Sequence, residues 1–506
     1  MNYPFWDVGI GYGWLMAVVA VLHVFVSHFA IGGGLYLVVT EHLARRTNDG
    51  LRLEFLQRLS KFFVLVTLVF GGLSGVGIWF VIGLLNPAAT EVLIHNFVWG
   101  WATEWTFFVV EITSALLYYY GWKRISARSH LILGWIYFVA AWLSLFIING
   151  IVTFMLTPGS WLQTGNFWDG FFNPTFWPSL AFRTGVCIML AGLYALLVAS
   201  RFPKSDSLTR LVRYNAGWGL AGLILMVPTF YWYWKSIPGA ITVSALERMP
   251  TPIQAVTASY WYAGGVAVLL ILFGFLLAKR YTTVIALVTM LFGLLWFGEY
   301  EWFRESIRKP FVITDFMYGN GVEVAYARVY QEEGYLNQMV YRTGDKGADL
   351  FRRLCRSCHT LSGYKPLKPV FDGTDEPFIA DMVKGTQLMR GHMPPFLGKP
   401  WEADTLAAYL AARTDRRPVS QVFGLSGVEL GKTVFDQRCA PCHWAGGVSD
   451  KTESLAGLSD QEYDDILTNA AELGDGMPAF TASEEERAAL IAYFKTLQKG
   501  AAHVTP

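Results

Sequence analysis

The sequence predicts an all-α protein: a polytopic membrane helical bundle of about eight transmembrane helices, followed by two small helical modules outside the membrane. The 506 residues are 53 % hydrophobic and only 16 % charged, whereas soluble chains contain about 25 % charged residues. Long apolar stretches recur through the first three fifths of the chain. The remaining part carries two copies of one short motif, which indicates an internal repeat.

Eight stretches are long and apolar enough for transmembrane helices, each of which needs about 20 residues. The loops that follow the odd-numbered stretches hold fourteen Lys and Arg residues, against two in the even-numbered loops. Basic loops stay in the cytoplasm, so both ends of the bundle segment are expected outside. The stretches are residues 13–38, 62–85, 98–121, 131–155, 178–200, 215–235, 258–278 and 283–303.

The repeated motif is C-x-x-C-H, in which two thiols bond a haem covalently and the histidine binds its iron. Four of the five cysteines are used in this way. A zinc site is the alternative, but no compact set of four ligands is formed. The sequence therefore predicts two haem c groups, at Cys355-Arg-Ser-Cys358-His359 and at Cys439-Ala-Pro-Cys442-His443.

A methionine follows each motif histidine at the same distance. Met393 lies 34 residues after His359, and Met477 lies 34 residues after His443. A thioether opposite histidine raises the iron potential and suits electron transfer. Core packing is the alternative role for either methionine, and His392 is a rival ligand for the first haem.

The haem sites also predict a compartment, because haem is attached to this motif on the outer side of energy-transducing bacterial membranes. The two modules are therefore expected on the periplasmic side of the bacterial cytoplasmic (inner) membrane. Eight crossings that begin outside also end outside, so the predicted topology agrees with this placement. The net charge of +1 says nothing useful about partners, and no basic patch suggests a nucleic-acid partner.

Polar residues inside the apolar stretches are costly and mark candidate functional sites. The first stretch contains His23 and His28, and the third contains Glu104 and Glu111, which a spacing of seven places on one helix face. Such groups in an aromatic bundle suggest buried haem and a proton path; hydrogen-bonded helix packing is the alternative. Further ionisable residues end the last stretch, at Glu299, Glu301, Arg304, Glu305, Arg308 and Lys309.

Three other residues are expected to play no catalytic role. Cys187, in the middle of a stretch, is expected to be a small buried apolar residue. His42 and His130 lie at predicted cytoplasmic helix ends, where solvated or interfacial histidine is expected.

The membrane half resembles subunit I of the cytochrome bd oxidase family. The likeness is carried by residues 23–41, by residues 104–122, and by Glu305-Ser-Ile-Arg308-Lys309-Pro310-Phe311. The resemblance implies that His23 and Glu305 bind two high-spin haems, haem b and/or haem d, and that Arg308 contacts propionates. It implies that Glu104 and Glu111 are proton-path or haem-side carboxylates. It further implies oxygen as substrate and a second membrane subunit as partner.

The chain also departs from that family. The family's low-spin haem ligands, a histidine on the fifth helix and a methionine on the seventh, have no counterpart here, and only residues 236–257 remain where the family has its quinol-binding loop. The quinol route is therefore expected to be lost and replaced by the two c-type haems. His28 lies outside the family pattern; it is either a ligand of a third haem or a packing or second-shell partner of His23.

The predicted domains are a bd-like membrane domain, a linker, and two modules that resemble class I cytochromes c, at residues 1–311, 312–340, 341–415 and 424–500. The favoured hypothesis is a bd-like terminal oxidase subunit that takes electrons from a periplasmic donor through the c haems. One alternative is a quinol-oxidising subunit that passes electrons to a periplasmic cytochrome acceptor. Another is a non-catalytic conduit in a larger respiratory complex.

Overall fold

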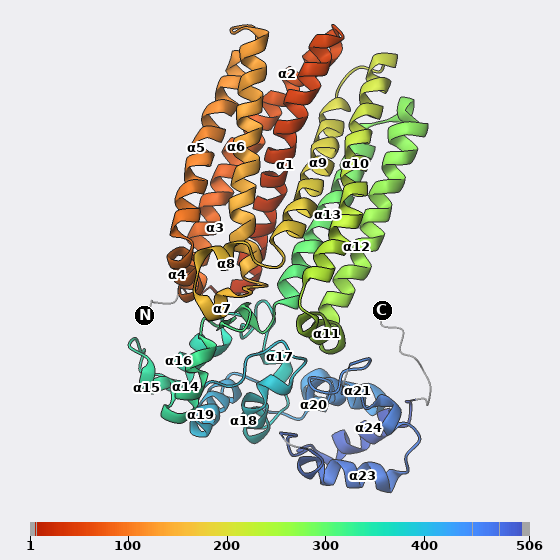
Figure 1. Ribbon diagram of the computed structural model, residues 1–506. Helices are drawn as coiled ribbons and strands as arrows, with labels where there is room; N and C mark the ends of the chain where they lie inside the picture. Colours follow the sequence, from red (N-terminus) through yellow and green to blue (C-terminus); the bar gives the residue numbers. More distant parts are fainter. Residues whose placement is uncertain (1–5, 7, 448, 475, 498–506) are drawn as a thin grey trace.

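The computed structural model describes residues 6, 8–447, 449–474 and 476–497. A few residues of the first predicted domain and residues 498–500 of the last lie outside this part. Eight long spans run side by side in a bundle (Figure 1), and the all-α prediction is confirmed. They are α1 (Tyr12–Arg46), the continuous span α2–η1–α3 (Gly50–Leu85), α5 (Val98–Gly121), α6 (Ala127–Phe154), α9 (Phe176–Ala199), α10 (Asp206–Ser236), α12–η2 (Pro250–Leu276) and α13 (Thr283–Ile307).

Six of these spans are long and apolar enough to cross a membrane, within the part that the structure describes. The other two, α5 and α10, stand in the same bundle (Figure 1) but are less apolar. Helix α5 carries Glu104 and Glu111, and α10 has charged residues near both ends and Pro228 inside. Polar groups in a bundle are tolerated where neighbouring helices cover them.

Short helices close the end of the bundle that faces the C-terminal part of the chain (Figure 1). The connections rich in Lys and Arg lie at the opposite end, as the alternating loops predicted. One of these, between α12–η2 and α13, contains η3 (Ala278–Arg280). The short helices are α4 (Pro87–Asn96), α7 (Trp161–Thr164), α8 (Phe167–Phe171) and α11 (Gly239–Arg248).

Helix α9 is the central element of the bundle. Of its apolar stretch 72 % is buried, against 17–39 % in the other five candidate spans. Glycines allow this close packing: a Cβ at Gly32 of α1 would collide with the carbonyl of Cys187, and one at Gly222 of α10 would collide with the backbone of Met189. Small residues let helix backbones approach in this way. Cys187 is fully buried, as expected.

The segment expected to be a linker is folded. It forms a hairpin of β1 (Phe311–Ile313) and β2 (Met317–Tyr318), then η4 (Val324–Tyr326), α14 (Ala327–Glu333) and α15 (Tyr335–Gln338). The backbone N–H groups of Tyr335 and Leu336 donate to the Glu402 carboxylate at 2.9 and 2.7 Å. Both side chains join the core of the following module. Hydrogen bonds and core packing therefore attach this segment to the following module.

The C-terminal part contains two hydrophobic cores, at residues 322–411 and 419–494, separate from the membrane core. We call the helical units around them module 1 and module 2. Module 1 contains α16 (Lys346–Leu350), η5 (Phe351–Cys355), α17 (Lys368–Phe371), α18 (Glu376–Lys384), η6 (Thr386–Leu388) and α19 (Pro400–Ala411). Module 2 contains α20 (Val419–Phe423), α21 (Gly427–Arg438), α22 (Thr452–Leu455), α23 (Asp460–Thr468), η7 (Ala470–Glu472) and α24 (Glu484–Phe494).

The two modules repeat each other in detail, with an offset of 84 residues. A Cβ at Gly347 would collide with Tyr409, and a Cβ at Gly431 would meet Tyr493, so glycine permits the first and last helices to cross in both modules. Glu486 repeats the role of Glu402: it accepts from the backbone N–H of Val419 at the start of its module and from that of Ser483, the N-cap of its own helix. A capping box formed by Ser483 and Glu486 opens the last helix.

Candidate functional site: two haem-attachment motifs and a polar bundle interior

Each motif histidine is oriented by a backbone carbonyl six residues later. His359 Nδ1 lies 3.2 Å from the carbonyl oxygen of Lys365, and His443 Nδ1 lies 2.8 Å from that of Ser449. A carbonyl only accepts, so Nδ1 carries the hydrogen and Nε2 keeps the lone pair that binds iron. Burial lowers the pKa of His359 to about 4, which keeps this ring neutral. The four motif cysteines are free and partly exposed, so the residues fit covalently attached haem.

The loops that contain the predicted methionine ligands turn at glycines with positive φ. Gly391 has a φ of 64° two residues before Met393, and Gly476 has a φ of 76° directly before Met477. Met393 packs, with Cys355, against the core of module 1. Burial lowers the pKa of His392 to about 4, so this rival ligand is also neutral.

The two attachment motifs are in contact across the module boundary. The Arg390 guanidinium, in the Met393 loop, donates to the carbonyl oxygen of Ala440 at 3.0 and 3.3 Å. Cys442 of the second motif packs against the core of module 1. The second haem site therefore adjoins the methionine side of the first.

Module 1 rests on the membrane half through the start of α1. The Tyr364 N–H donates to the carbonyl of Ile10 at 3.1 Å, and the Arg356 guanidinium donates to the carbonyl of Val8 at 3.0 Å. Arg356 lies within the first attachment motif, and Tyr364 follows the motif by five residues. Lys309, just past the end of α13, is an electrostatic neighbour of Cys358 in that motif. The first haem site therefore lies beside the end of α13.

Glu305 occupies the last turn of α13, next to this contact. Its carboxylate pairs with Arg308 and, at 2.8 Å, with Lys309. Arg308 is 6 % exposed, while the Glu305 side chain is 39 % exposed. The predicted anionic ligand and its predicted propionate partner are therefore in direct contact.

His28 belongs to a buried ionic cluster that joins α1, α9 and α13. Its Nδ1 donates to the Val24 carbonyl at 2.8 Å, and its Nε2 lies 3.2 Å from Arg183. Arg183 pairs with Glu301 at 3.0 Å, and Glu301 also pairs with Arg304 at 3.0 Å. Both ring nitrogens of His28 are engaged, which favours a packing role over binding a third haem.

His23 faces a different neighbour. Five residues separate it from His28, which turns the two side chains about 140° apart around α1. Its Nδ1 lies 3.2 Å from the hydroxyl of Ser74, and a Cβ at Gly75 would lie 3.2 Å from its ring. His23 therefore points to α3.

Glu104 and Glu111 share a neighbour on α6, Ser144. The Ser144 hydroxyl donates to Glu104 at 3.2 Å and also interacts with Glu111. Glu111 Oε1 is buried and has no hydrogen-bond partner within the described part of the chain. A chain of carboxylate, hydroxyl and carboxylate can relay protons along the α5–α6 interface.

The expectation for His130 is wrong, because its side chain is only 1 % exposed. It donates through Nδ1 to Glu41 at 2.8 Å, and the Tyr118 hydroxyl donates to the same carboxylate at 2.7 Å. Position at a helix end suggested solvation, but Glu41, on the helix packed alongside, supplies a buried partner. His42 is exposed, as expected.

Sequence reasoning also missed Arg183 and Ser144. Arg183 is the only charged residue of α9, and a lone charge inside an apolar helix was a usable signal. Ser144 gave no signal, because serine is common in membrane helices.

The fold and the sites together define an integral membrane protein with a polar bundle interior and two C-x-x-C-H motifs. Residues 13–232 match the family model described as cytochrome bd terminal oxidase subunit I, and residues 427–494 match the one described as cytochrome c oxidase, cbb3-type, subunit III. The chain thus combines a segment of the bd subunit I type with a segment of the cytochrome c type, which confirms the resemblance seen in the sequence. Its class is haem-containing respiratory electron transfer.

A solved structure shares the membrane fold. The chain is similar to one in "The structure of bd oxidase from Geobacillus thermodenitrificans", with 14 % identity and a TM-score of 0.50, covering 60 % of this chain and 89 % of that one. No curated protein matches. The matched residues 13–232 include His23, His28, Glu104 and Glu111, whereas Glu305 and the first haem motif lie outside both matched segments.

Proposed function

We propose that this chain is the haem-bearing subunit of a cytochrome bd-like terminal oxidase that takes electrons from a periplasmic donor and reduces oxygen inside the bundle. One observation carries the proposal: the first haem-attachment motif rests on the membrane half beside Glu305. This contact provides an entry for electrons from outside. Electrons would enter through this contact and not from quinol, because the sequence lacks the family's low-spin haem ligands and most of its quinol-binding loop.

The residues present suit the implied haems. His359 with Met393, and His443 with Met477, would hold the two c-type haems. His23 and Glu305 would hold buried haem b or haem d, with Arg308 and Lys309 available to propionates. Bound in this way, the haems supply one-electron transfer and, where the iron is five-coordinate, oxygen binding.

The order of the modules follows from their contacts. Module 1 touches the membrane half through Arg356 and Tyr364. Module 2 touches module 1 through Ala440 and Cys442. We therefore assign module 1 as the inner module and module 2 as the outer one, where a soluble donor would dock.

The membrane setting is proposed on the same grounds. The basic loops lie at the end of the bundle away from the modules (Figure 1), so the modules would face the periplasm. The likeness to bd oxidases suggests that a second membrane subunit of that type accompanies this one.

The direct test is oxygen uptake by the purified complex supplied with reduced cytochrome c. We expect uptake with this donor and none with quinol. Uptake with quinol alone, or none with either donor, would refute the oxidase proposal.

Replacing His23 with alanine is expected to remove carbon monoxide binding at one of the two buried haems of the reduced protein, because only five-coordinate haem iron binds this gas. The spectra of both c-type haems should stay unchanged. A matched control is His42→Ala, an exposed histidine at the far end of the same helix. An unchanged amount of carbon monoxide binding in His23→Ala would exclude His23 as a haem ligand.

Replacing Glu111 with glutamine is expected to slow oxygen uptake by about 100-fold, the usual contribution of a positioned proton-transfer group. The reason is that Glu111 and Glu104 share Ser144 in a partly buried relay. Thr106→Val, on the exposed side of the same helix, is the control. An unchanged rate in Glu111→Gln would rule out proton transfer through this carboxylate.

A further inference from the structure

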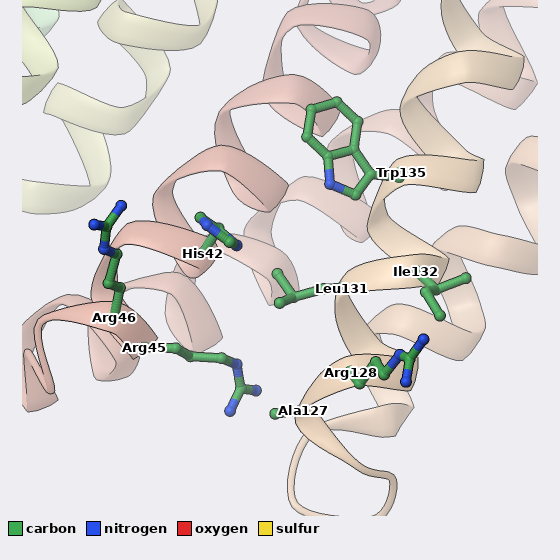
Figure 2. Close-up of a pocket in the computed structure, with 8 residues that line it drawn as sticks. All are labelled: His42, Arg45, Arg46, Ala127, Arg128, Leu131, Ile132 and Trp135. Atoms are coloured by element: carbon green, nitrogen blue, oxygen red, sulfur yellow. The ribbon is translucent and has the colours of Figure 1, made fainter.

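A basic hollow opens between α1 and α6 at the end of the bundle away from the haem modules. Its volume is about 450 Å³. Figure 2 shows its residues rising from α1 on one side and from α6 on the other. Three arginines and one histidine line it, and none of the lining residues is acidic. They are His42, Arg45, Arg46, Ala127, Arg128, Leu131, Ile132 and Trp135.

One of these arginines is held in position and the others are free to bind. Arg45 Nε donates to Glu41 at 2.6 Å, and the same carboxylate is fixed by His130 and Tyr118. Arg46 and Arg128 are exposed and form no salt bridge with any residue that the structure describes. After Glu41 offsets one charge, the hollow therefore keeps an excess of positive charge.

An apolar stripe on α6 continues from the hollow toward the middle of the bundle. Ile132, Trp135, Ile136 and Val139 are 50, 44, 43 and 49 % exposed. Their spacing of three and four residues places them on one helix face. A cationic hollow at one end of a membrane-facing apolar stripe matches a molecule with an anionic head and apolar tails.

We infer that this hollow binds an anionic phospholipid of the cytoplasmic leaflet, with its phosphate at the arginines and its acyl chains along α6. Basic pockets between membrane helices on the cytoplasmic side recognise such headgroups. A free phosphate ion has no apolar part that could contact the stripe on α6. A covering protein subunit would need an acidic counterpart for the arginines. The inference does not depend on the oxidase proposal.

The test uses the full purified chain and native mass spectrometry with phosphatidylglycerol and phosphatidylcholine of equal chain length. We expect retention of phosphatidylglycerol and weak retention of phosphatidylcholine. Arg46→Gln/Arg128→Gln should weaken phosphatidylglycerol binding by about 30-fold, because each basic residue near an anionic lipid contributes about a factor of five. Trp135→Ser should weaken binding of both lipids.

The control is Lys204→Gln/Arg210→Gln, which removes two charges from the same end of the bundle, near α10. Equal binding of the two lipids, or an equal loss in the control, would overturn the inference. Full competition by inorganic phosphate would assign a free-anion site instead. Loss of lipid binding when the second subunit is present would assign the hollow to that subunit.

Discussion

Replacing Glu301 with glutamine is expected to destabilise the bundle by about 3–5 kcal/mol, enough to prevent accumulation of the folded protein. Glu301 is 8 % exposed and neutralises Arg183 and Arg304, which are 5 % and 16 % exposed. Removal of the carboxylate charge leaves the buried guanidinium of Arg183 and the partly buried one of Arg304 without their salt-bridge partner. The measurement is the midpoint of detergent-induced unfolding and the yield of membrane-inserted protein.

The matched control is Glu299→Gln, two residues earlier on α13, where no salt bridge is formed among the residues described by the structure. Arg183→Leu should lower the stability of the bundle less, because Glu301 still forms its salt bridge with Arg304. The double variant Arg183→Leu/Glu301→Leu should be milder than the sum of its parts, since the pair is removed together. If Glu301→Gln and Glu299→Gln have equal stability, the cluster does not hold the bundle together.

The bundle was predictable because its signals are local. Each span needs a run of apolar residues, and loop charge alternates with the side of the membrane. The haem sites were predictable for a similar reason: C-x-x-C-H is complete within five residues, and the 84-residue repeat places Glu402 and Glu486 in equivalent roles. The prediction of a polar bundle interior likewise needed only the cost of charge in an apolar helix.

The remaining features depend on contacts between distant parts of the chain. Arg183 and Glu301 are more than a hundred residues apart, and only the packing of α9 against α13 brings them together. His130 was misjudged because its partner, Glu41, lies on another helix. The apolar residues of the folded segment at residues 312–340 follow no regular period. The carboxylate that accepts its backbone hydrogen bonds, Glu402, lies in α19. Docking of module 1 through Ile10 and Tyr364 uses backbone groups that no residue type reveals.

The order of the modules predicts different outcomes for two equivalent changes when a small reductant is the donor. Cys355→Ala/Cys358→Ala removes the attachment site of module 1, and Cys439→Ala/Cys442→Ala removes that of module 2. Without the first site, anaerobic reduction of the buried haems should fall to background with every external donor. Without the second site, reduction by a protein donor should fall to background, while a small reductant should still work.

Module 1 touches the membrane half, and module 2 touches module 1. A small reductant reaches module 1 directly, whereas a protein donor needs module 2 as its docking surface. The measurement is optical reduction of the buried haems, with covalent haem staining to show that each variant lost only one c-type haem. Equal behaviour of the two variants would contradict a series arrangement. If a protein donor reduces the buried haems without the second site, then module 2 is not the point of entry, and the contacts between Arg390 and Ala440 serve stability alone.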